Sequence, residues 1–263
     1  MPDTERAGPA QARAEELSAI LRDAGQLALG RFRGTVKSWT KDHSSPVSEV
    51  DIAVNEFLHA HLDRSDTGWL SEESQDDPVR LKQSRVWVVD PIDGTRGYLA
   101  GLPDWSVSVA LVEAGRPVLA GLYAPVADQM YIARRGGGAT VNGLPIRVQD
   151  GDTLAGARIA GPRDYVDRVS RTANGIVTMP KVHSLALRLA RVAHGQLEAA
   201  FASTQARDWD LAAADLLVHE AGGLLTTVAG ENLRYNQPVP VHGALVAAGP
   251  VRHAVLLDLV HKK

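Results

Sequence analysis

The feature that most constrains this chain is a short apolar run that leads straight into an acidic turn. Residues 86–89 (Val-Trp-Val-Val) are typical of a buried strand, and Asp90-Pro91-Ile92-Asp93-Gly94-Thr95 follows at once. A regular extended strand does not point Asp90 and Asp93 the same way, so we expect the strand to stop and the chain to turn. Functional sites of α/β proteins form at strand ends, and hard divalent cations prefer oxygen ligands. The stretch therefore predicts a mixed fold with a metal site.

The first half of the chain predicts two helices followed by an antiparallel meander. Apolar residues at helical spacing indicate a helix over 9–33 and, after a polar loop over 37–48, a second helix that has Ser48 as its N-cap and reaches Leu62. A short strand at 68–71 precedes the acidic pair Glu72-Glu73. From Trp105 onward, alternation and Gly-rich turns indicate a mostly antiparallel sheet, with strands at 106–112, 118–123 and 129–134.

The second half alternates strands with helices. The predicted strands are 157–160, 197–202, 224–228 and 244–248, and the predicted helices are 184–194, 209–221 and a terminal one that ends near Leu259. We place a soft boundary near 150–152. Residues 1–150 would form an α+β half with most of the metal ligands, and residues 151–263 an α/β half that contributes Asp210 and substrate contacts.

Composition excludes several classes of protein. The chain of 263 residues has no cysteine, which excludes disulfides, thiolate metal sites and cysteine nucleophiles. A net charge of −3 gives no support for a polyanion-binding surface, so we expect no nucleic-acid polymer as a partner. The N-terminus has no signal-peptide pattern, and no apolar run approaches the roughly 20 residues of a membrane span. We therefore expect a cytoplasmic protein with no membrane partner.

Three acidic elements adjoin apolar ones: Glu72-Glu73, Asp90 with Asp93, and Asp210 in the first turn of a helix. Brought together, these carboxylates would repel one another and have raised pKa values unless cations neutralised them. Each has a plainer explanation when taken alone, because Asp and Gly form turns, surface glutamates face solvent, and aspartate is a common N-cap. Only their occurrence as an ordered set favours a shared metal site.

The ordered set resembles the inositol monophosphatase family, whose superfamily also holds the 3′(2′),5′-bisphosphate nucleotidases and some fructose-bisphosphatases. The resemblance covers about residues 39–249. It rests on Lys41 with Pro46-Val47-Ser48-Glu49-Val50-Asp51, on Glu72-Glu73, on residues 87–95, and on Trp209-Asp210-Leu211-Ala212-Ala213 with Glu220-Ala221-Gly222-Gly223. It implies a lithium-sensitive, Mg²⁺-dependent phosphatase with two to three ions per site. The implied fold is a layered α-β-α-β-α sandwich of the sugar-phosphatase type.

The resemblance also implies a role for individual residues. The metal ligands would be Glu72, Asp90, the backbone carbonyl of Ile92, Asp93 and Asp210. Asp90 would bridge two ions, and Glu73 is the alternative to Glu72. The catalytic residues would be Glu72, which helps to activate water, and the pair Asp51 and Thr95, which holds the attacking water. Substrate contacts would come from Lys41, Gly94, Thr95, Ser184, Arg188 and Asp210.

The residues after the acidic turn bear on which phosphate ester is hydrolysed. Thr95-Arg96-Gly97-Tyr98 departs both from the T-T-N-F of inositol phosphatases and from the T-K-E-F of bisphosphate nucleotidases, and His183-Ser184 replaces the family's G-S or G-T. Residues 202–205 lack the glutamate that grips an inositol hydroxyl. Arg188 is either a surface arginine or a contact for a second phosphate. We favour 3′-phosphoadenosine-5′-phosphate, hydrolysed to AMP, over inositol 1-phosphate or another sugar phosphate.

A hypothesis of another class is a non-catalytic, metal-dependent binding protein. The presence of every predicted ligand opposes it. The expected partner is a small phosphorylated substrate. The resemblance leaves a homodimer open, because family members include both dimers and monomers.

Overall fold

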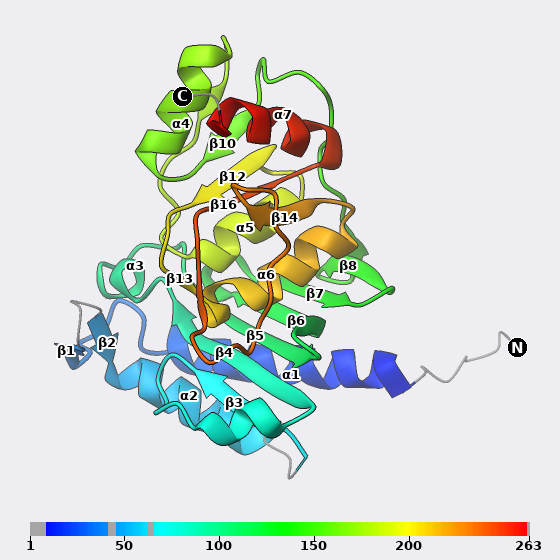
Figure 1. Ribbon diagram of the computed structural model, residues 1–263. Helices are drawn as coiled ribbons and strands as arrows, with labels where there is room; N and C mark the ends of the chain where they lie inside the picture. Colours follow the sequence, from blue (N-terminus) through cyan, green and yellow to red (C-terminus); the bar gives the residue numbers. More distant parts are fainter. Residues whose placement is uncertain (1–8, 42–45, 63–65, 262–263) are drawn as a thin grey trace, which may run out of the picture.

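Two β-sheets alternate with three layers of helices in the computed structural model, which describes residues 9–41, 46–62 and 66–261 (Figure 1). Helices α1 (Pro9–Leu29) and α2 (Glu49–Leu62) cover the outer face of the larger sheet. Helices α5 (Leu185–Ala193) and α6 (Asp208–Glu220) lie between the sheets, and α4 (Arg163–Thr172) and α7 (Pro250–His261) cover the smaller sheet. The order of layers confirms the expected α-β-α-β-α fold.

The larger sheet is buried on both faces. Val86 and Val88 point into the central core, whereas Trp87 and Val89 point into the core beneath α1 and α2, as the two-residue period of a strand requires. Its first two strands are parallel and the others antiparallel, as the meander pattern predicted. In spatial order, its strands are β3 (Gly68–Ser71), β4 (Arg85–Asp93), β5 (Ser106–Glu113), β6 (Arg116–Ala124), β7 (Gln129–Arg134), β8 (Gly138–Val141) and β9 (Leu144–Pro145).

The smaller sheet lies on the far side of α5 and α6. Its spatial order is β11 (Val177–Thr178), β10 (Arg158–Ala160), β12 (Ala199–Ala202), β16 (Leu245–Ala248) and β14 (Leu224–Thr227). The central core combines Val88 of the larger sheet with Leu187 of α5, Leu211 of α6 and Leu225 of the smaller sheet. The same core therefore contains residues from both sides of the boundary predicted near 150–152.

Several elements differ from the sequence expectations. The first helix ends at Leu29 rather than Arg33, because after Gly30 the amides of Arg31 and Phe32 donate only three residues back, to the carbonyls of Ala28 and Leu29, as in a turn. The expected polar loop over 37–48 contains two short paired strands, β1 (Ser38–Thr40) and β2 (Pro46–Ser48). Helix α4 was not predicted, because it buries only Val166 and Val169 and packs against α7 near the chain end.

The strand before the acidic residues also does not stop where expected. β4 continues through both aspartates and pairs with β5 at Asp90↔Ser108 and Asp93↔Ser106. The register shifts between these two pairs, which marks a bulge. The bulge, rather than the turn that the sequence predicts, supplies the change of direction, and it brings Asp90 and Asp93 to one side. The short helix α3 (Thr95–Leu99) begins immediately afterwards.

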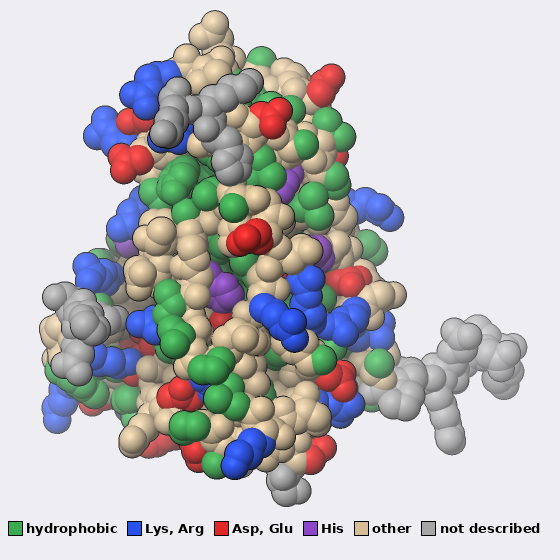
Figure 2. Space-filling model, viewed as in Figure 1, with side chains coloured by type: hydrophobic (Ala, Val, Ile, Leu, Met, Phe, Trp, Pro, Cys, Tyr) green, Lys and Arg blue, Asp and Glu red, His purple; other side chains and the backbone are tan. Residues whose placement is uncertain are grey.

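The helices, the surface charges and one short strand pair complete the structure. Among the described helices, none combines the length and the apolar character that crossing a membrane requires. Acidic and basic side chains are interspersed over the face shown in Figure 2. The remaining short pair, β13 (Ala206–Arg207) and β15 (Val241–His242), is antiparallel and leads into α6.

Candidate metal centre

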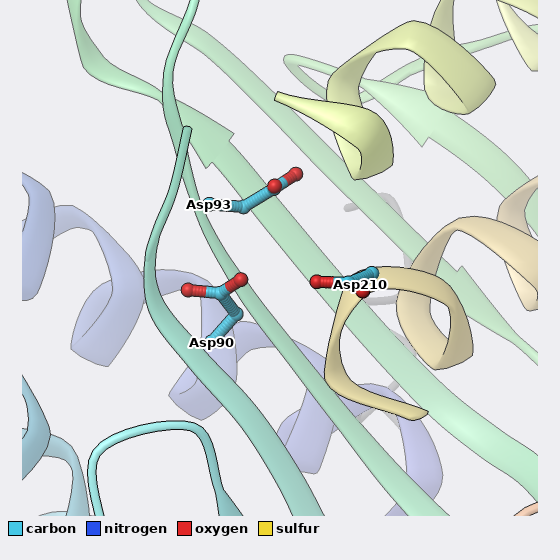
Figure 3. A group of neighbouring side chains, drawn as sticks. All are labelled: Asp90, Asp93 and Asp210. Atoms are coloured by element: carbon cyan, nitrogen blue, oxygen red, sulfur yellow. The ribbon is translucent and has the colours of Figure 1, made fainter. Parts of the chain in front are cut away.

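Three carboxylates that are distant in the sequence meet at one place (Figure 3). Asp90 and Asp93 project from β4 and Asp210 from the first turn of α6, and one oxygen of each lies within 4.8 Å of the others. Asp90 and Asp93 are buried, and Asp210 is partly exposed. Oδ1 of Asp90 has no hydrogen-bond partner among the described residues. A buried carboxylate oxygen without a donor is costly unless a cation lies against it.

Burial and mutual repulsion raise the pKa values of these carboxyls. Burial is the main cause of the increase for Asp90, whose pKa lies well above its usual range, and the neighbouring charges of Glu72 and Asp93 add to it. Burial and the charge of Asp93 likewise raise the pKa of Asp210 well above its usual range. The pKa of Asp93 is raised to about 6 by burial, while a hydrogen bond from Ser184 opposes the increase. Such a group fits a hard divalent cation, which favours the charged form of each carboxylate.

The two glutamates of the acidic pair have different surroundings. Glu73 has a side chain that is 1% exposed and forms an ion pair with Lys41, whose Nζ also donates to the Glu72 carbonyl oxygen at 3.1 Å. Glu72 is partly exposed, and burial together with the charge of Glu73 raises its pKa to about 7. Its charge acts on Asp90 and Asp210. These contacts favour Glu72 as the residue that faces the three aspartates and Glu73 as the partner of Lys41.

Asp51 and Thr95 form the hydrogen-bonded pair that the resemblance implied. Thr95 Oγ1 lies 2.9 Å from Asp51 Oδ1 and 2.9 Å from the carbonyl oxygen of Ile92. The other oxygen of Asp51 accepts hydrogen bonds from the amide and the hydroxyl of Ser48, the N-cap of α2. The Ser48–Asp51 capping box therefore fixes the carboxylate at the start of that helix. Thr95 is held between this carboxylate and the bulge of β4.

Asp93 receives a set of donors from the start of α5. The hydroxyl of Ser184 donates to it at 2.5 Å, and the amides of Leu185 and Ala186 donate at 3.2 and 2.6 Å. Ser184 is fully buried and caps α5, and its hydroxyl also lies 3.0 Å from that of Ser106. The substrate contact expected of Ser184 stays a prediction, whereas the structure shows its buried hydroxyl holding Asp93 in this conformation.

Gly94 and Gly97 allow the start of α5 to approach β4 and α3. Gly94 has φ +96°, and a Cβ there would lie 3.0 Å from the amide nitrogen of Ser184. A Cβ at Gly97 would lie 2.8 Å from Cβ of His183, so the histidine occupies the space that a side chain at 97 would need. The departures from the family pattern at 97 and 183 therefore compensate for each other.

Arg188 is half-buried on α5, so it is not the freely exposed arginine that was one of the two alternatives. Burial lowers its pKa, and the charge of Asp93 opposes this effect. Its Nε has no hydrogen-bond partner in the part of the chain that the structure describes. Because the Nε atom is itself buried, it would reach a further acceptor only if the side chain shifted.

Some residues around the site had no signal in the sequence. Ser106 reaches Ser184 across 78 positions, and Asp208 is fully buried, where it contacts His242 at 2.7 Å. Both contacts depend on the pairing of elements far apart in the chain. In the sequence, Asp208 is marked only by its place two residues before Asp210, which does not reveal its contact with His242.

A family model and several curated proteins match this chain. The family model described as the inositol monophosphatase family matches residues 10–263. The inositol-1-monophosphatase of Mesorhizobium japonicum is 33% identical over 250 residues, which are 89% of this chain and 91% of that protein. The fructose-1,6-bisphosphatase/inositol-1-monophosphatase of Thermotoga maritima is 33% identical over 81% of this chain and 83% of its own length.

A solved structure agrees with these relatives. The extragenic suppressor protein suhB of Bartonella henselae superposes with a TM-score of 0.85 and 26% identity, over 95% of this chain and 99% of that one. The family model matches both halves of the molecule, including the elements that carry the three aspartates. The chain belongs to the inositol monophosphatase family, and it is a phosphatase, a phosphoric monoester hydrolase.

Proposed function

We propose that the chain is a Mg²⁺-dependent phosphatase of small sugar or cyclitol phosphates, with inositol 1-phosphate as its first candidate substrate. The observation that carries the proposal is the convergence of Asp90, Asp93 and Asp210 within 4.8 Å, with a buried oxygen of Asp90 left without a donor. The names of the relatives from Mesorhizobium and Thermotoga support this substrate class. They move the bisphosphate nucleotidase hypothesis to second place.

The residues present fit magnesium, since all the converging side chains offer carboxylate oxygens. Asp90, Asp93, Asp210 and Glu72, together with the Ile92 carbonyl, would hold the ions. When bound, magnesium would neutralise the charge of the phosphate and make a water molecule more acidic. Thr95 would orient that water, because its hydroxyl oxygen can accept a hydrogen bond from the water while its O–H donates one to Asp51. The N–H groups at the start of α3, from Gly94 onward, would bind phosphate oxygens.

A second candidate is 3′-phosphoadenosine-5′-phosphate, and Arg188 is the observation that favours it. A substrate with a second phosphate could pair with the positive charge of Arg188, which already acts on Asp93, whereas inositol 1-phosphate has no second anion to offer. Arg188→Met should then lower kcat/KM for the bisphosphate much more than that for inositol 1-phosphate.

Phosphate release from inositol 1-phosphate, fructose 1,6-bisphosphate and 3′-phosphoadenosine-5′-phosphate tests the proposal, with and without Mg²⁺. We expect Mg²⁺-dependent release from all active substrates and the highest kcat/KM for inositol 1-phosphate. The second candidate would be established if kcat/KM were higher for the adenosine bisphosphate than for inositol 1-phosphate and if Arg188→Met abolished this preference. Absence of release from all three esters, with folded protein and bound Mg²⁺, would support the non-catalytic alternative.

A further inference from the structure

Arg80 is a buried arginine whose five N–H groups all have acceptors. It lies in the 3₁₀ helix η2 (Pro78–Lys82), between Glu72-Glu73 and β4, and its side chain is 1% exposed. Nε and Nη2 donate to the two oxygens of Asp76 at 2.5 and 2.8 Å. Nη1 donates to Asn236 Oδ1 at 2.6 Å, and Nη1 and Nη2 each donate to the Gln237 carbonyl at 3.2 Å. Such complete pairing ties the two segments together firmly.

The same contacts continue to the start of α6. The amide of Asn236 donates to Asp208 Oδ2 at 2.6 Å, and His242 Nε2 lies 2.7 Å from Asp208 Oδ1. Asp208 is fully buried in the first turn of α6, two residues before Asp210. One series of hydrogen bonds therefore connects the segment that follows Glu72 with the helical turn that presents Asp210.

The Arg80 end of this series is packed against the sheet. A Cβ added to Gly68, the first residue of β3, would lie 3.1 Å from Cα and Cβ of Arg80. β3 is the strand that leads into Glu72, whose amide donates to the Val89 carbonyl of β4 at 3.2 Å. A displacement of Arg80 would therefore be transmitted to the strand that positions Glu72.

We propose that Asp76, Arg80, Asn236, Asp208 and His242, which we call the Arg80 bridge, set the position of Asp210 relative to Glu72 and thereby the affinity for Mg²⁺. Arg80 would act as a positioning residue, through its effect on residues that hold the ion. The inference rests on the proposed function, because it assumes that Glu72 and Asp210 serve one metal centre. Residues that orient metal ligands typically change metal affinity or activity about 10–100-fold when they are replaced.

A buried arginine could also act only on stability, so the test needs a matched control. Arg252 is 5% exposed on α7, where Nη1 donates to the Gln149 carbonyl at 2.7 Å and Nη2 to the Thr153 carbonyl at 3.4 Å. Arg80→Lys and Arg252→Lys each keep a positive charge and remove the planar fork. Both should lower the melting temperature, but only Arg80→Lys should change the metal centre.

The decisive measurement is Mg²⁺ binding to the metal-free full chain by isothermal titration calorimetry, alongside the Mg²⁺ concentration that gives half-maximal phosphate release. We expect Arg80→Lys to raise the Mg²⁺ dissociation constant and the half-maximal Mg²⁺ concentration by about 10-fold each. Arg252→Lys should leave both quantities at the wild-type value. Asn236→Gly is a second, milder variant. Asn236 has φ +56°, which glycine adopts readily, and the change keeps the amide that donates to Asp208.

Asn236→Gly should raise the Mg²⁺ dissociation constant several-fold even if Arg80→Lys does not fold. Wild-type Mg²⁺ affinity in every folded bridge variant would overturn the inference and leave Arg80 a structural residue. A wild-type protein that binds no Mg²⁺ and releases no phosphate would instead contradict the proposed function, so the two failures are distinct.

Discussion

At the scale of single residues, Asp90 illustrates a conflict between stability and function. Its carboxylate is buried, lacks a donor at Oδ1 and has a pKa well above its usual range, mainly because of burial. Asp90→Asn removes the cost of keeping this group charged or protonated at neutral pH. We expect the metal-free variant to have a higher free energy of unfolding than the wild type at neutral pH and to lose about 10²–10³-fold in kcat/KM.

Thermal unfolding without Mg²⁺ and phosphate-release assays with Mg²⁺ check this prediction. Asp167→Asn, at an exposed position of α4 beside Arg163, is the matched control and should change neither quantity. A metal-free Asp90→Asn protein that is less stable than the wild type would show that the carboxylate is not under electrostatic strain.

Two substitutions of Thr95 distinguish the role of its hydroxyl group from the role of its side-chain shape. Its Oγ1 lies 2.9 Å from Asp51 Oδ1, whereas the methyl group contributes only packing. Thr95→Val keeps the shape and removes the hydroxyl, so we expect kcat to fall about 100-fold. Thr95→Ser keeps the hydroxyl and should retain most of the activity. Equal kcat values for the two variants, measured at saturating Mg²⁺, would remove Thr95 from the catalytic group.

At the scale of elements, the close approach of β4, α3 and the start of α5 depends on Gly94. Gly94→Ala should cost about 1–2 kcal/mol for its left-handed backbone (φ +96°). The new Cβ should also push Ser184 away from Asp93. Gly143→Ala is the control, because Gly143 has φ +79° with nothing within 4 Å of its Cβ position. Urea unfolding should show a similar decrease in the free energy of unfolding for both variants. Phosphate release should be lost only in Gly94→Ala.

At the scale of the whole molecule, stability should depend on pH and Mg²⁺ together. Burial and the charge of Glu73 raise the pKa of Glu72 to about 7, and burial raises that of Asp93 to about 6. The folded metal-free protein therefore binds more protons than the unfolded chain, so its stability should decrease as pH rises from about 4.5 to 7. Mg²⁺ needs the ionised carboxylates and should reverse this trend.

Melting temperatures with and without Mg²⁺ at pH 5.5 and pH 7.5 measure the effect. The increase caused by Mg²⁺ should be larger at pH 7.5, because protons compete with the ion at pH 5.5. A larger increase at pH 5.5 would mean that these carboxyls do not bind Mg²⁺.

Much of the fold was predictable because the spacing of apolar residues within a single helix or strand indicates that element. The short strand-like runs of β5, β6 and β7 and the apolar spacing of α5 marked these elements in the sequence, although β5 and most of β6 are buried on both faces. The bulge of β4 was not predictable, because it depends on the register with β5, which the strand's own residues do not specify. The start of α1 was predicted correctly and only its end was misplaced, whereas α4 was missed because it buries only Val166 and Val169.

The sequence by itself determined the family of this protein, which the ordered motifs identify, and the carboxylates that we propose as metal ligands, Asp90, Asp93 and Asp210. Only the tertiary structure decided how those residues are used. It turned Glu73 toward Lys41, buried Ser184 behind Asp93, and joined Arg80 to Asn236 across 156 positions. The physical reason is that residue type sets what a side chain can bind, whereas burial and pairing between distant elements set which partner it meets.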